Sequence, residues 1–342
     1  MTNRYEKLKN ELLESPKTWC ITGAAGFIGS NLLESLLKLN QKVVGIDNFN
    51  TGYQKNLDEV QKIVSPEQWQ RFEFINGDIR DLDPCLKATD GADYVLHQAA
   101  LVSVPLSMED PVQTHDINVN GFHNILHACH QNKVGRLVYA SSSAVYGDDT
   151  LPAKVEETIG NALSPYATSK YLNEIYAKHY GSYFKLPSVG LRYFNVFGPR
   201  QDPGGAYAAV ISKWLSSMIK NEPIVIFGTG EATRDYCHVG NVVQANLLAA
   251  TIKNTDELDQ VFNVGLGLKT NLNELFQIIK SALAKKHPHV QNIEPEYKDS
   301  RPGDILHSTA NVESISKALS YESAISLQQG IEATLSYYEN VD

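Results

Sequence analysis

Short apolar runs alternate with longer amphipathic stretches through the first 200 residues of this 342-residue chain. The apolar runs have the length and composition of buried strands and lie at 17–22, 42–46, 72–75, 93–97, 136–140 and 188–192. Helical spacing of apolar residues appears at 31–38 and 117–131, and residues 50–70 form a variable crossover. Strands that alternate with helices predict an α/β fold with a doubly wound parallel sheet.

The regular alternation weakens after residue 198. Helices are predicted at 206–220, 239–251 and 272–283, and strands at 224–227 and 260–264. We therefore expect a larger domain at 1–198, which includes an N-terminal helix at 1–16, and a smaller mixed α/β lobe at 199–342. The lobe is expected to cover the carboxyl edge of the sheet, with some segments returning to the larger domain.

Three glycines lie between the first strand and the first helix of the larger domain. Gly23, Gly26 and Gly29 permit a tight turn and a close approach of the backbone to a pyrophosphate, which the helix N-terminus also attracts. Asp47 ends the second strand near the offset expected of a carboxylate that binds an adenosine ribose. Because Asn48 rather than an arginine follows, the turn predicts an NAD-binding Rossmann domain and favours NAD over NADP.

A tyrosine and a lysine lie four residues apart at the start of another predicted helix. Ser164 suits the N-cap and Pro165 the first helical position. The spacing puts Tyr166 and Lys170 on one helical face, where the ammonium would lower the pKa of the phenol. Such a tyrosine exchanges a proton with a substrate hydroxyl. The pair alone also fits a helix whose tyrosine packs and whose lysine is solvated.

Polar residues also follow two other strands. The fifth strand runs into Ser142 and Ser143, which places hydroxyls at the carboxyl edge, where such sheets bind ligands. Asp78 follows the third strand, either as an adenine-site residue or as a strand-ending cap.

Two loops of the smaller lobe combine an arginine with an aspartate. Arg234 precedes Asp235 directly, and Arg301 precedes Asp304 by three residues. An arginine fork suits phosphate oxygens, and an aspartate suits ribose hydroxyls. The two loops are therefore candidates for binding a nucleoside diphosphate.

The composition argues against several partners. A formal net charge of −9 disfavours nucleic acid or an anionic membrane as the main partner, since both attract a basic face. No apolar run approaches the length of a membrane span. The first 16 residues lack the apolar segment of a secretory signal, and the 4 cysteines are scattered without Cys-x-x-Cys spacing. We therefore expect free thiols and a cytoplasmic location.

In chain order these motifs resemble the extended short-chain dehydrogenase/reductase superfamily over nearly the whole chain. That resemblance is carried by Gly23-x-x-Gly26-x-x-Gly29, the Ser142 region and Tyr166-x-x-x-Lys170. Further motifs resemble UDP-hexose 4-epimerases, namely Arg192-Tyr-Phe-Asn195-Val-x-Gly198-Pro, Arg234-Asp and Arg301-x-Gly-Asp304. Within that family the chain is most similar to bacterial UDP-N-acetylglucosamine 4-epimerases, which supply precursors for O-antigen and capsule.

The resemblance implies roles for individual residues. Ser142 matches the catalytic serine that holds the sugar O4, Tyr166 the general base and acid, and Lys170 the residue that binds the nicotinamide ribose and lowers the tyrosine pKa. NAD contacts are implied at Gly23, Gly26, Phe27, Ile28, Gly29, Asp47, Asn48, Asp78, Ile79, Ala99, Asn118, Tyr166, Lys170 and Tyr193. UDP-sugar contacts are implied at Ser103, Ser142, Ser143, Tyr166, Asn195, Arg234, Arg301, Asp304 and Ser308.

The implied reaction is inversion at C4 of a UDP-sugar, with NAD tightly bound and regenerated in each cycle. Tyr166 takes the O4 proton while hydride passes from C4 to NAD, and the 4-keto sugar then turns over before both return. Epimerases restricted to non-acetylated hexoses carry a bulky tyrosine at the position of Ser308. A serine there leaves room for an N-acetyl group, so we expect UDP-GlcNAc and UDP-GalNAc as substrates. Ser308 also fits an ordinary loop residue.

Other functions remain open. One is an epimerase that acts mainly on UDP-glucose and UDP-galactose. A 4,6-dehydratase shares the fold and NAD but needs an acid/base pair beside the catalytic hydroxyl, whereas Ser143 and Ala144 follow Ser142 here. A non-catalytic NAD-bound regulator would not need Tyr166 and Lys170.

Three histidines share one face of the helix predicted at 117–131. A metal site at His123, His127 and His130 lacks a completing carboxylate or cysteine, so we expect no metal and favour a solvated or interface face. The resemblance implies that this helix packs into the four-helix bundle of a dimer. A homodimer is therefore expected.

Overall fold

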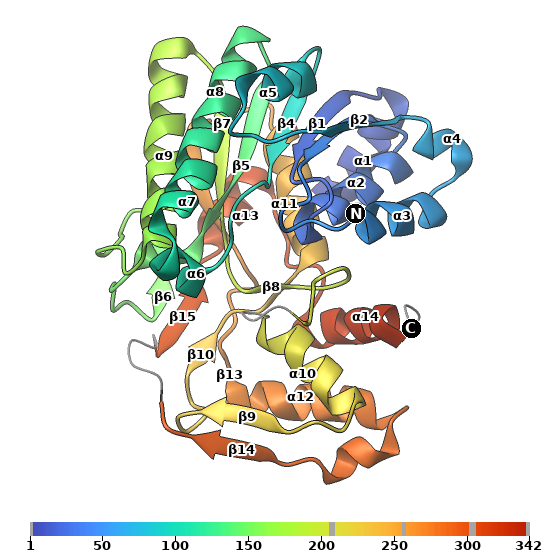
Figure 1. Ribbon diagram of the computed structural model, residues 1–342, viewed down its shortest axis with the longest axis vertical. Coiled ribbons are helices and arrows are strands. Elements are labelled where there is room, and N and C mark those ends of the chain that lie inside the picture. Colours follow the sequence, from blue (N-terminus) through green and yellow to red (C-terminus); the bar gives the residue numbers. More distant parts are fainter. Residues whose placement is uncertain (1–2, 205–208, 255–257, 301–305, 340–342) are drawn as a thin grey trace.

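A large α/β body lies above a smaller lobe in the computed structural model (Figure 1). The structure describes residues 3–204, 209–254, 258–300 and 306–339. Helices α8 (Gly121–Gln131) and α9 (Pro165–Phe184) stand together along one side of the body.

The main sheet has strand order β12-β7-β5-β4-β1-β2-β3, and all neighbouring strands run parallel. Its strands are β1 (Thr18–Thr22), β2 (Lys42–Asp47), β3 (Phe72–Asn76), β4 (Tyr94–His97), β5 (Arg136–Ser142), β7 (Ser188–Tyr193) and β12 (Gln260–Val264). The predicted doubly wound sheet is confirmed. The strand order changes direction between β1 and β4, and sheets of this kind bind ligands beside that point.

Helices cover both faces of the sheet because consecutive strand residues point to opposite sides. Trp19 and Ile21 belong to the core under α1 (Arg4–Glu14), α2 (Phe27–Lys38), α3 (Gln54–Ile63), α11 (Val239–Thr251) and α13 (Glu313–Leu319). Cys20, between them, belongs to the core under α5 (Leu82–Thr89), α8 and α9. The strands are therefore buried on both sides, which explains their nearly continuous apolar sequences.

Several crossovers differ from the sequence prediction. The variable stretch at 50–70 contains α3 and the short α4 (Pro66–Trp69). The helix predicted at 117–131 divides into a π-helical turn, η1 (Asp116–Asn120), and α8, preceded by α6 (Val104–Glu109) and α7 (Pro111–His115). The described part of the helix predicted at 206–220 is α10 (Val210–Ile219). Burial of Leu57 and Val60 against the body stabilises α3, a contact that only the tertiary structure supplies.

The described part of the smaller lobe contains three short sheets. Their strands are β6 (Ala153–Lys154), β8 (Val196–Phe197), β9 (Ile224–Phe227), β10 (Thr233–Arg234), β11 (Cys237–His238), β13 (Thr270–Asn271), β14 (Pro295–Lys298) and β15 (His307–Ala310). Helices α10, α12 (Leu272–Ala284) and α14 (Leu327–Glu339), with the 3-10 turn η4 (Pro288–Asn292), complete it. Strand β12 and helix α11 return to the body, while β6 comes from before residue 198. The boundary at 198 stays a prediction.

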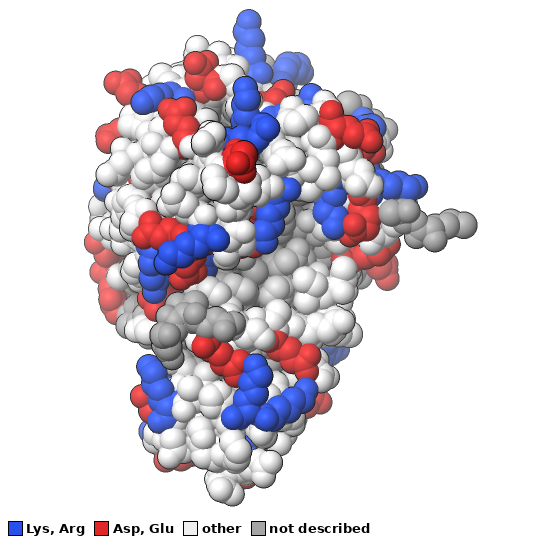
Figure 2. Space-filling view, turned by 90° about the vertical axis from the view of Figure 1, so that its right-hand side faces the viewer, with Lys and Arg blue, Asp and Glu red and all other residues white. Residues whose placement is uncertain are grey.

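The surface and the cysteines add two observations. On the face shown in Figure 2, acidic and basic side chains are interspersed over the described residues rather than gathered by sign. Among the described helices, none combines the length and the apolar character that a membrane crossing needs. All four cysteines are buried free thiols.

Candidate active site

The glycine turn meets the end of β4 beside the point where the strand order changes direction. Gly23 has φ +71°, and a Cβ there would lie 2.8 Å from the amide nitrogen of Ala99. A Cβ at Gly29 would lie 2.0 Å from the carbonyl oxygen of Gly23. Gly26 is the N-cap of α2 and supplies no side chain, so the N–H groups of Phe27 and Ile28 at the helix start have no side-chain cap. This cradle fits a pyrophosphate.

Asp47 lies directly against the glycine turn. Its carboxylate accepts hydrogen bonds from the backbone N–H of Ala25 at 2.9 Å and of Phe49 at 2.8 Å. Burial raises the pKa of Asp47, and these hydrogen bonds oppose the shift. A carboxylate has about four acceptor positions, so Asp47 keeps acceptors for the hydroxyls of a ribose.

Asp78 lies beside Asn48, across the ends of β2 and β3. Asn48 donates a hydrogen bond to Asp78 at 2.7 Å. Arg80 forks onto the same carboxylate, with Nη2 at 2.8 Å and Nε at 3.1 Å. These contacts, the Arg80 hydrogen bond above all, hold the pKa of Asp78 at about 2. The sequence reasoning did not single out Arg80, which keeps Asp78 ionised at this edge.

Three other predicted residues are engaged with the protein itself. Asn118, which is 1% exposed, hydrogen-bonds the backbone of Leu101 and the hydroxyl of Ser169. Ile79 is buried, with its side chain close to Gly121. Ser103 caps α6. Their ligand contacts stay predictions, and the visible role of Asn118 is to tie the loop after β4 to α9.

The three predicted catalytic residues meet at the end of β5. Helix α9 begins at Pro165, and Ser164 caps it by accepting from the N–H of Ala167, as predicted. The hydroxyl of Ser142 lies close enough to the phenol of Tyr166 to favour its charged form. Lys170 is 2% exposed and donates to the carbonyl oxygen of Ala140 at 3.0 Å, on the strand that leads to Ser142.

The prediction that the pKa of Tyr166 lies below its ordinary value is wrong for this structure. Burial raises that pKa, and the nearby hydroxyl of Ser142 opposes the shift only in part. The ammonium of Lys170 donates to a backbone carbonyl, and burial lowers the pKa of Lys170 to about 8. Desolvation disfavours both charged forms, an effect that helical spacing alone did not reveal.

Tyr193 belongs to a polar triad beside the predicted catalytic residues. It pairs in register with Ser142 across β7 and β5. Its hydroxyl donates to Gln98 at 3.1 Å and accepts from Asn246 at 2.9 Å, and Gln98 and Asn246 are hydrogen-bonded to each other. Tyr193 is therefore held rigidly at the sheet edge where a nicotinamide ring is predicted.

Strands of the smaller lobe bring together three predicted substrate residues. Arg234 and Ser308 are register partners in the parallel pair of β10 with β15. Asn195 donates its side-chain amide to the carbonyl oxygen of Asp235 at 3.0 Å, next to Arg234 in the chain. Arg301 and Asp304 lie outside the described residues. Ser143, also predicted, is the first residue of the 3-10 turn η2 (Ser143–Tyr146) that follows Ser142.

Asp235 does not offer its carboxylate to a ribose, so that prediction is wrong. The side chain is fully buried and accepts the backbone N–H groups of Leu266, Gly267 and Ala310 at 2.8, 2.9 and 3.2 Å. Burial raises its pKa to about 6. Asp235 instead holds β10 against β15 and the turn after β12.

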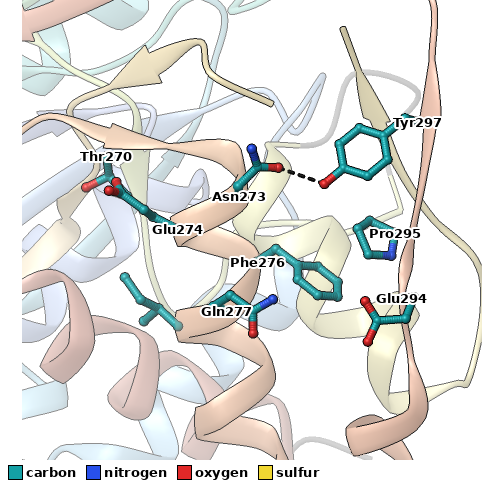
Figure 3. Close-up of a pocket in the computed structure, with 9 residues that line it drawn as sticks. Thr270, Asn273, Glu274, Phe276, Gln277, Glu294, Pro295 and Tyr297 are labelled. Carbon is teal, nitrogen blue, oxygen red and sulfur yellow. Dashed lines mark hydrogen bonds between the residues drawn. The ribbon is translucent and has the colours of Figure 1, made fainter. Parts of the chain in front are cut away.

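A cavity of about 640 Å³ lies elsewhere, between α12 and β14 (Figure 3). The rings of Phe276 and Tyr297 line it, and the Tyr297 hydroxyl donates to Asn273 at 2.9 Å. None of the predicted site residues within the described ranges lines this cavity. It is therefore separate from the described part of the candidate active site.

Two of the three histidines of α8, His123 and His130, lie against aromatic side chains of α9. The rings of His123 and Tyr180 lie 5.8 Å apart, and those of His130 and Phe184 lie 5.2 Å apart. Within the described residues, no three His, Cys, Asp or Glu side chains are grouped so that they could hold a metal ion.

A family model supplies the decisive comparison. The model described as the NAD dependent epimerase/dehydratase family matches residues 19–265, which is most of the chain. The chain belongs to this family. NAD is accordingly its cofactor, and the glycine cradle with Asp47 fits that assignment by its geometry.

Relatives of this epimerase/dehydratase chain act on different UDP-sugars. A provisionally named UDP-glucose 4-epimerase of Methanocaldococcus jannaschii is 38% identical, with 94% of this chain and 98% of the relative covered. One solved structure is the UDP-N-acetylglucosamine 4-epimerase of Methanobrevibacter ruminantium in complex with UDP-N-acetylmuramic acid. It is 34% identical with a TM-score of 0.85, and the match covers 95% of this chain and 98% of that one. Another is the Bacillus cereus UDP-glucuronic acid 4-epimerase in complex with UDP-glucuronic acid and NAD. It is 31% identical with a TM-score of 0.82, and the match covers 95% of this chain and 100% of that one.

Sequence reasoning missed a buried network next to the predicted catalytic residues. Arg192 in β7 donates hydrogen bonds to Glu174 on α9 and to Tyr146 at the end of η2. Two signals were present in the sequence. Glu174 follows Lys170 at helical spacing, and Arg192 interrupts an apolar strand.

Proposed function

We propose that this chain is a UDP-sugar 4-epimerase that interconverts UDP-GlcNAc and UDP-GalNAc. UDP-sugar 4-epimerisation is the activity named for the similar proteins, whereas their sugars differ. The observation that carries the N-acetyl preference is Ser308, a small residue that is 8% exposed and pairs with Arg234 across β10 and β15. A small side chain beside the proposed diphosphate anchor leaves room for an N-acetyl group. The product would serve O-antigen or capsule synthesis.

The proton at O4 is handled by Tyr166 and Ser142. Ser142 holds the sugar O4 hydroxyl, and its own hydroxyl, close to Tyr166, favours the phenolate that accepts the proton. NAD, when bound, would supply the hydride acceptor and donor for C4, so no net oxidation occurs. The resulting phenol of Tyr166 later returns the proton to the O4 oxygen of the turned 4-keto sugar, while hydride returns to the opposite face of C4.

Lys170 and the diphosphate anchor have supporting roles. The ammonium of Lys170, fixed by the carbonyl of Ala140, would bind the nicotinamide ribose. Arg234 and Asn195 would hold the UDP phosphates while the keto sugar turns over. Arg301 and Asp304 are proposed to complete this anchor.

Elimination chemistry is disfavoured by the residues after Ser142. The turn η2 comprises Ser143, Ala144, Val145 and Tyr146. No member is a carboxylic acid that could remove a C5 proton and protonate the leaving C6 hydroxyl. This turn therefore lacks the acid/base pair that a 4,6-dehydratase needs.

The deciding experiment uses purified protein and UDP-GlcNAc without added NAD. Proton NMR should show UDP-GalNAc accumulating, and parallel samples with UDP-glucose should convert with lower kcat/KM. No conversion of any UDP-sugar, even with NAD added, would contradict the proposed activity. Faster conversion of UDP-glucose than of UDP-GlcNAc would contradict the N-acetyl preference alone.

We also infer that the protein is a homodimer formed through α8 and α9. Helix α9 exposes large apolar side chains, namely Tyr171, Ile175, Tyr176, Tyr183 and Phe184. Tyr183 is 75% exposed, an unusual setting for an aromatic residue unless a partner covers it.

A further inference from the structure

A buried ion pair links the helix that carries Tyr166 to the strands of the sheet. Arg192 in β7 donates to Glu174 on α9 through Nε at 2.9 Å and Nη2 at 2.8 Å. The two side chains are only 3% and 7% exposed. A two-point fork fixes both distance and orientation, so it holds α9 in one position against β7.

The same ion pair holds the chain on both sides of Ser142. Ser141, the residue before it, donates its hydroxyl to Glu174 at 2.5 Å. Tyr146, at the end of the turn after it, accepts a hydrogen bond from Nη1 of Arg192 at 3.0 Å. Ser142 thus lies between two anchored points.

Tyr146 extends the network to a third strand of the sheet. Its hydroxyl donates to Asn263 in β12 at 2.6 Å, and the guanidinium carbon of Arg192 lies 4.9 Å from the centre of its ring. Ser141, Arg192 and Asn263 are successive register partners across β5, β7 and β12. The polar groups therefore form one line across the sheet immediately beside the catalytic residues.

Stability alone is a weak reason for such a pair. Removing two charges from water costs several kcal/mol per ion, and well-packed apolar residues often stabilise a protein as well or better. What apolar residues cannot supply is a fixed direction. A directional contact is useful here because Ser142 comes from β5 and Tyr166 from α9, and their hydroxyls must stay within hydrogen-bond reach.

We propose that the Glu174–Arg192 pair is a positioning device that sets Ser142 against Tyr166 and Lys170 for proton transfer at the sugar O4. Neither Glu174 nor Arg192 is assigned a contact with substrate or cofactor. The inference rests on the proposed epimerase activity and on the proposed roles of Ser142 and Tyr166. It predicts that weakening the pair slows the chemical step without weakening ligand binding.

The test compares wild type with Glu174→Gln, which keeps the shape of the side chain and removes its charge. We expect kcat per bound NAD to fall by about 10-fold or more, while KM for the UDP-sugar and the NAD content stay within about 2-fold. With a substrate deuterated at C4, the isotope effect on kcat should increase, because hydride transfer becomes more rate-limiting. A loss of folded enzyme would lower activity without changing the isotope effect.

Two further variants keep the test decisive. Glu34→Gln breaks a second arginine–glutamate pair among the described residues, in which Nη2 of buried Arg200 lies 2.7 Å from the partly buried Glu34. It should leave kcat and the isotope effect unchanged. Ser141→Ala removes only the hydroxyl contact with Glu174 and should show the same changes as Glu174→Gln, though smaller. It serves as the test if Glu174→Gln does not fold.

The outcomes separate this inference from the proposed function. If Glu174→Gln and Ser141→Ala keep kcat within about 2-fold, or lose it with an unchanged isotope effect, the positioning role is wrong. Failure of the epimerase assignment would appear already in the wild-type protein, as absence of conversion with every UDP-sugar.

Discussion

Arg234 and Ser308 are direct partners across the parallel strands β10 and β15. A larger side chain at Ser308 would therefore lie beside the proposed phosphate anchor. We expect Ser308→Tyr to lower kcat/KM for UDP-GlcNAc by about 10- to 100-fold. The kcat/KM for UDP-glucose should change by no more than about 3-fold. Coupled assays with both sugars measure this. His307→Tyr, one position earlier and exposed, is the control, since it points to the other face of the strand. Equal losses for both sugars would contradict the N-acetyl preference.

Replacing Tyr166 tests the proton transfer. Tyr166→Phe removes the hydroxyl that interacts with Ser142 while keeping the buried ring. We expect kcat to fall by about 10²- to 10⁴-fold, the range of general acid–base catalysis, while the melting temperature and bound NAD stay near wild type. Activity within a few-fold of wild type would exclude Tyr166 as the acid/base.

The glycine turn should not accept a side chain at position 29. In Gly29→Ala the new Cβ would lie 2.0 Å from the carbonyl oxygen of Gly23, so the turn must move. We expect a loss of about 1–3 kcal/mol in the free energy of unfolding and a clear fall in NAD bound after purification. Gly204→Ala is the matched control, because among the described residues the nearest atom to a Cβ there, Oδ1 of Asp202, is 3.4 Å away. Unchanged NAD content in Gly29→Ala would contradict the cradle.

Stability should fall in mild acid because His97 is buried in its neutral form. Burial lowers its pKa to about 3 from an ordinary 6.5, and Lys170 adds to the shift. Below pH 6.5 the unfolded chain binds a proton that the folded one does not, so this residue reduces stability by up to about 1.4 kcal/mol per pH unit towards pH 3. Urea unfolding at pH 7, 6 and 5 should show a shallower decline for His97→Gln. His238, with a pKa lowered to about 4, should maintain a residual slope. If the free energy of unfolding falls equally with pH in wild type and in His97→Gln, this prediction is wrong.

Charge on α9 should separate a dimer. Ile175 and Tyr183 are 36% and 75% exposed and lie two turns apart on the helix. We expect Ile175→Glu/Tyr183→Glu to elute as a monomer by size exclusion with light scattering, whereas wild type elutes as a dimer. Tyr297→Glu, which replaces a 56% exposed tyrosine in the smaller lobe, is the control. A monomeric wild type would show the dimer prediction to be wrong.

Much of the large body was predictable because its signals are local. Each main-sheet strand predicted from the sequence is present within one or two residues, since parallel strands buried on both faces are continuous apolar runs. The turn at Gly23 to Gly29 and the helix start at Ser164 were also predictable, because glycine conformation and helix capping depend on neighbouring residues. By itself the sequence therefore determined the parallel α/β sheet, the dinucleotide turn and the Tyr166–Lys170 spacing.

Only the tertiary structure decided how charged and polar groups are used. Asp235 is adjacent to Arg234 in the chain, yet it is buried and bound to three backbone N–H groups from β15 and the turn after β12. Tyr166 and Lys170 have the predicted spacing, yet burial opposes the charge of both. The Glu174–Arg192 pair joins residues 18 positions apart through the packing of α9 on β7. Desolvation and long-range hydrogen bonds depend on what surrounds a side chain, which helical or strand periodicity does not specify.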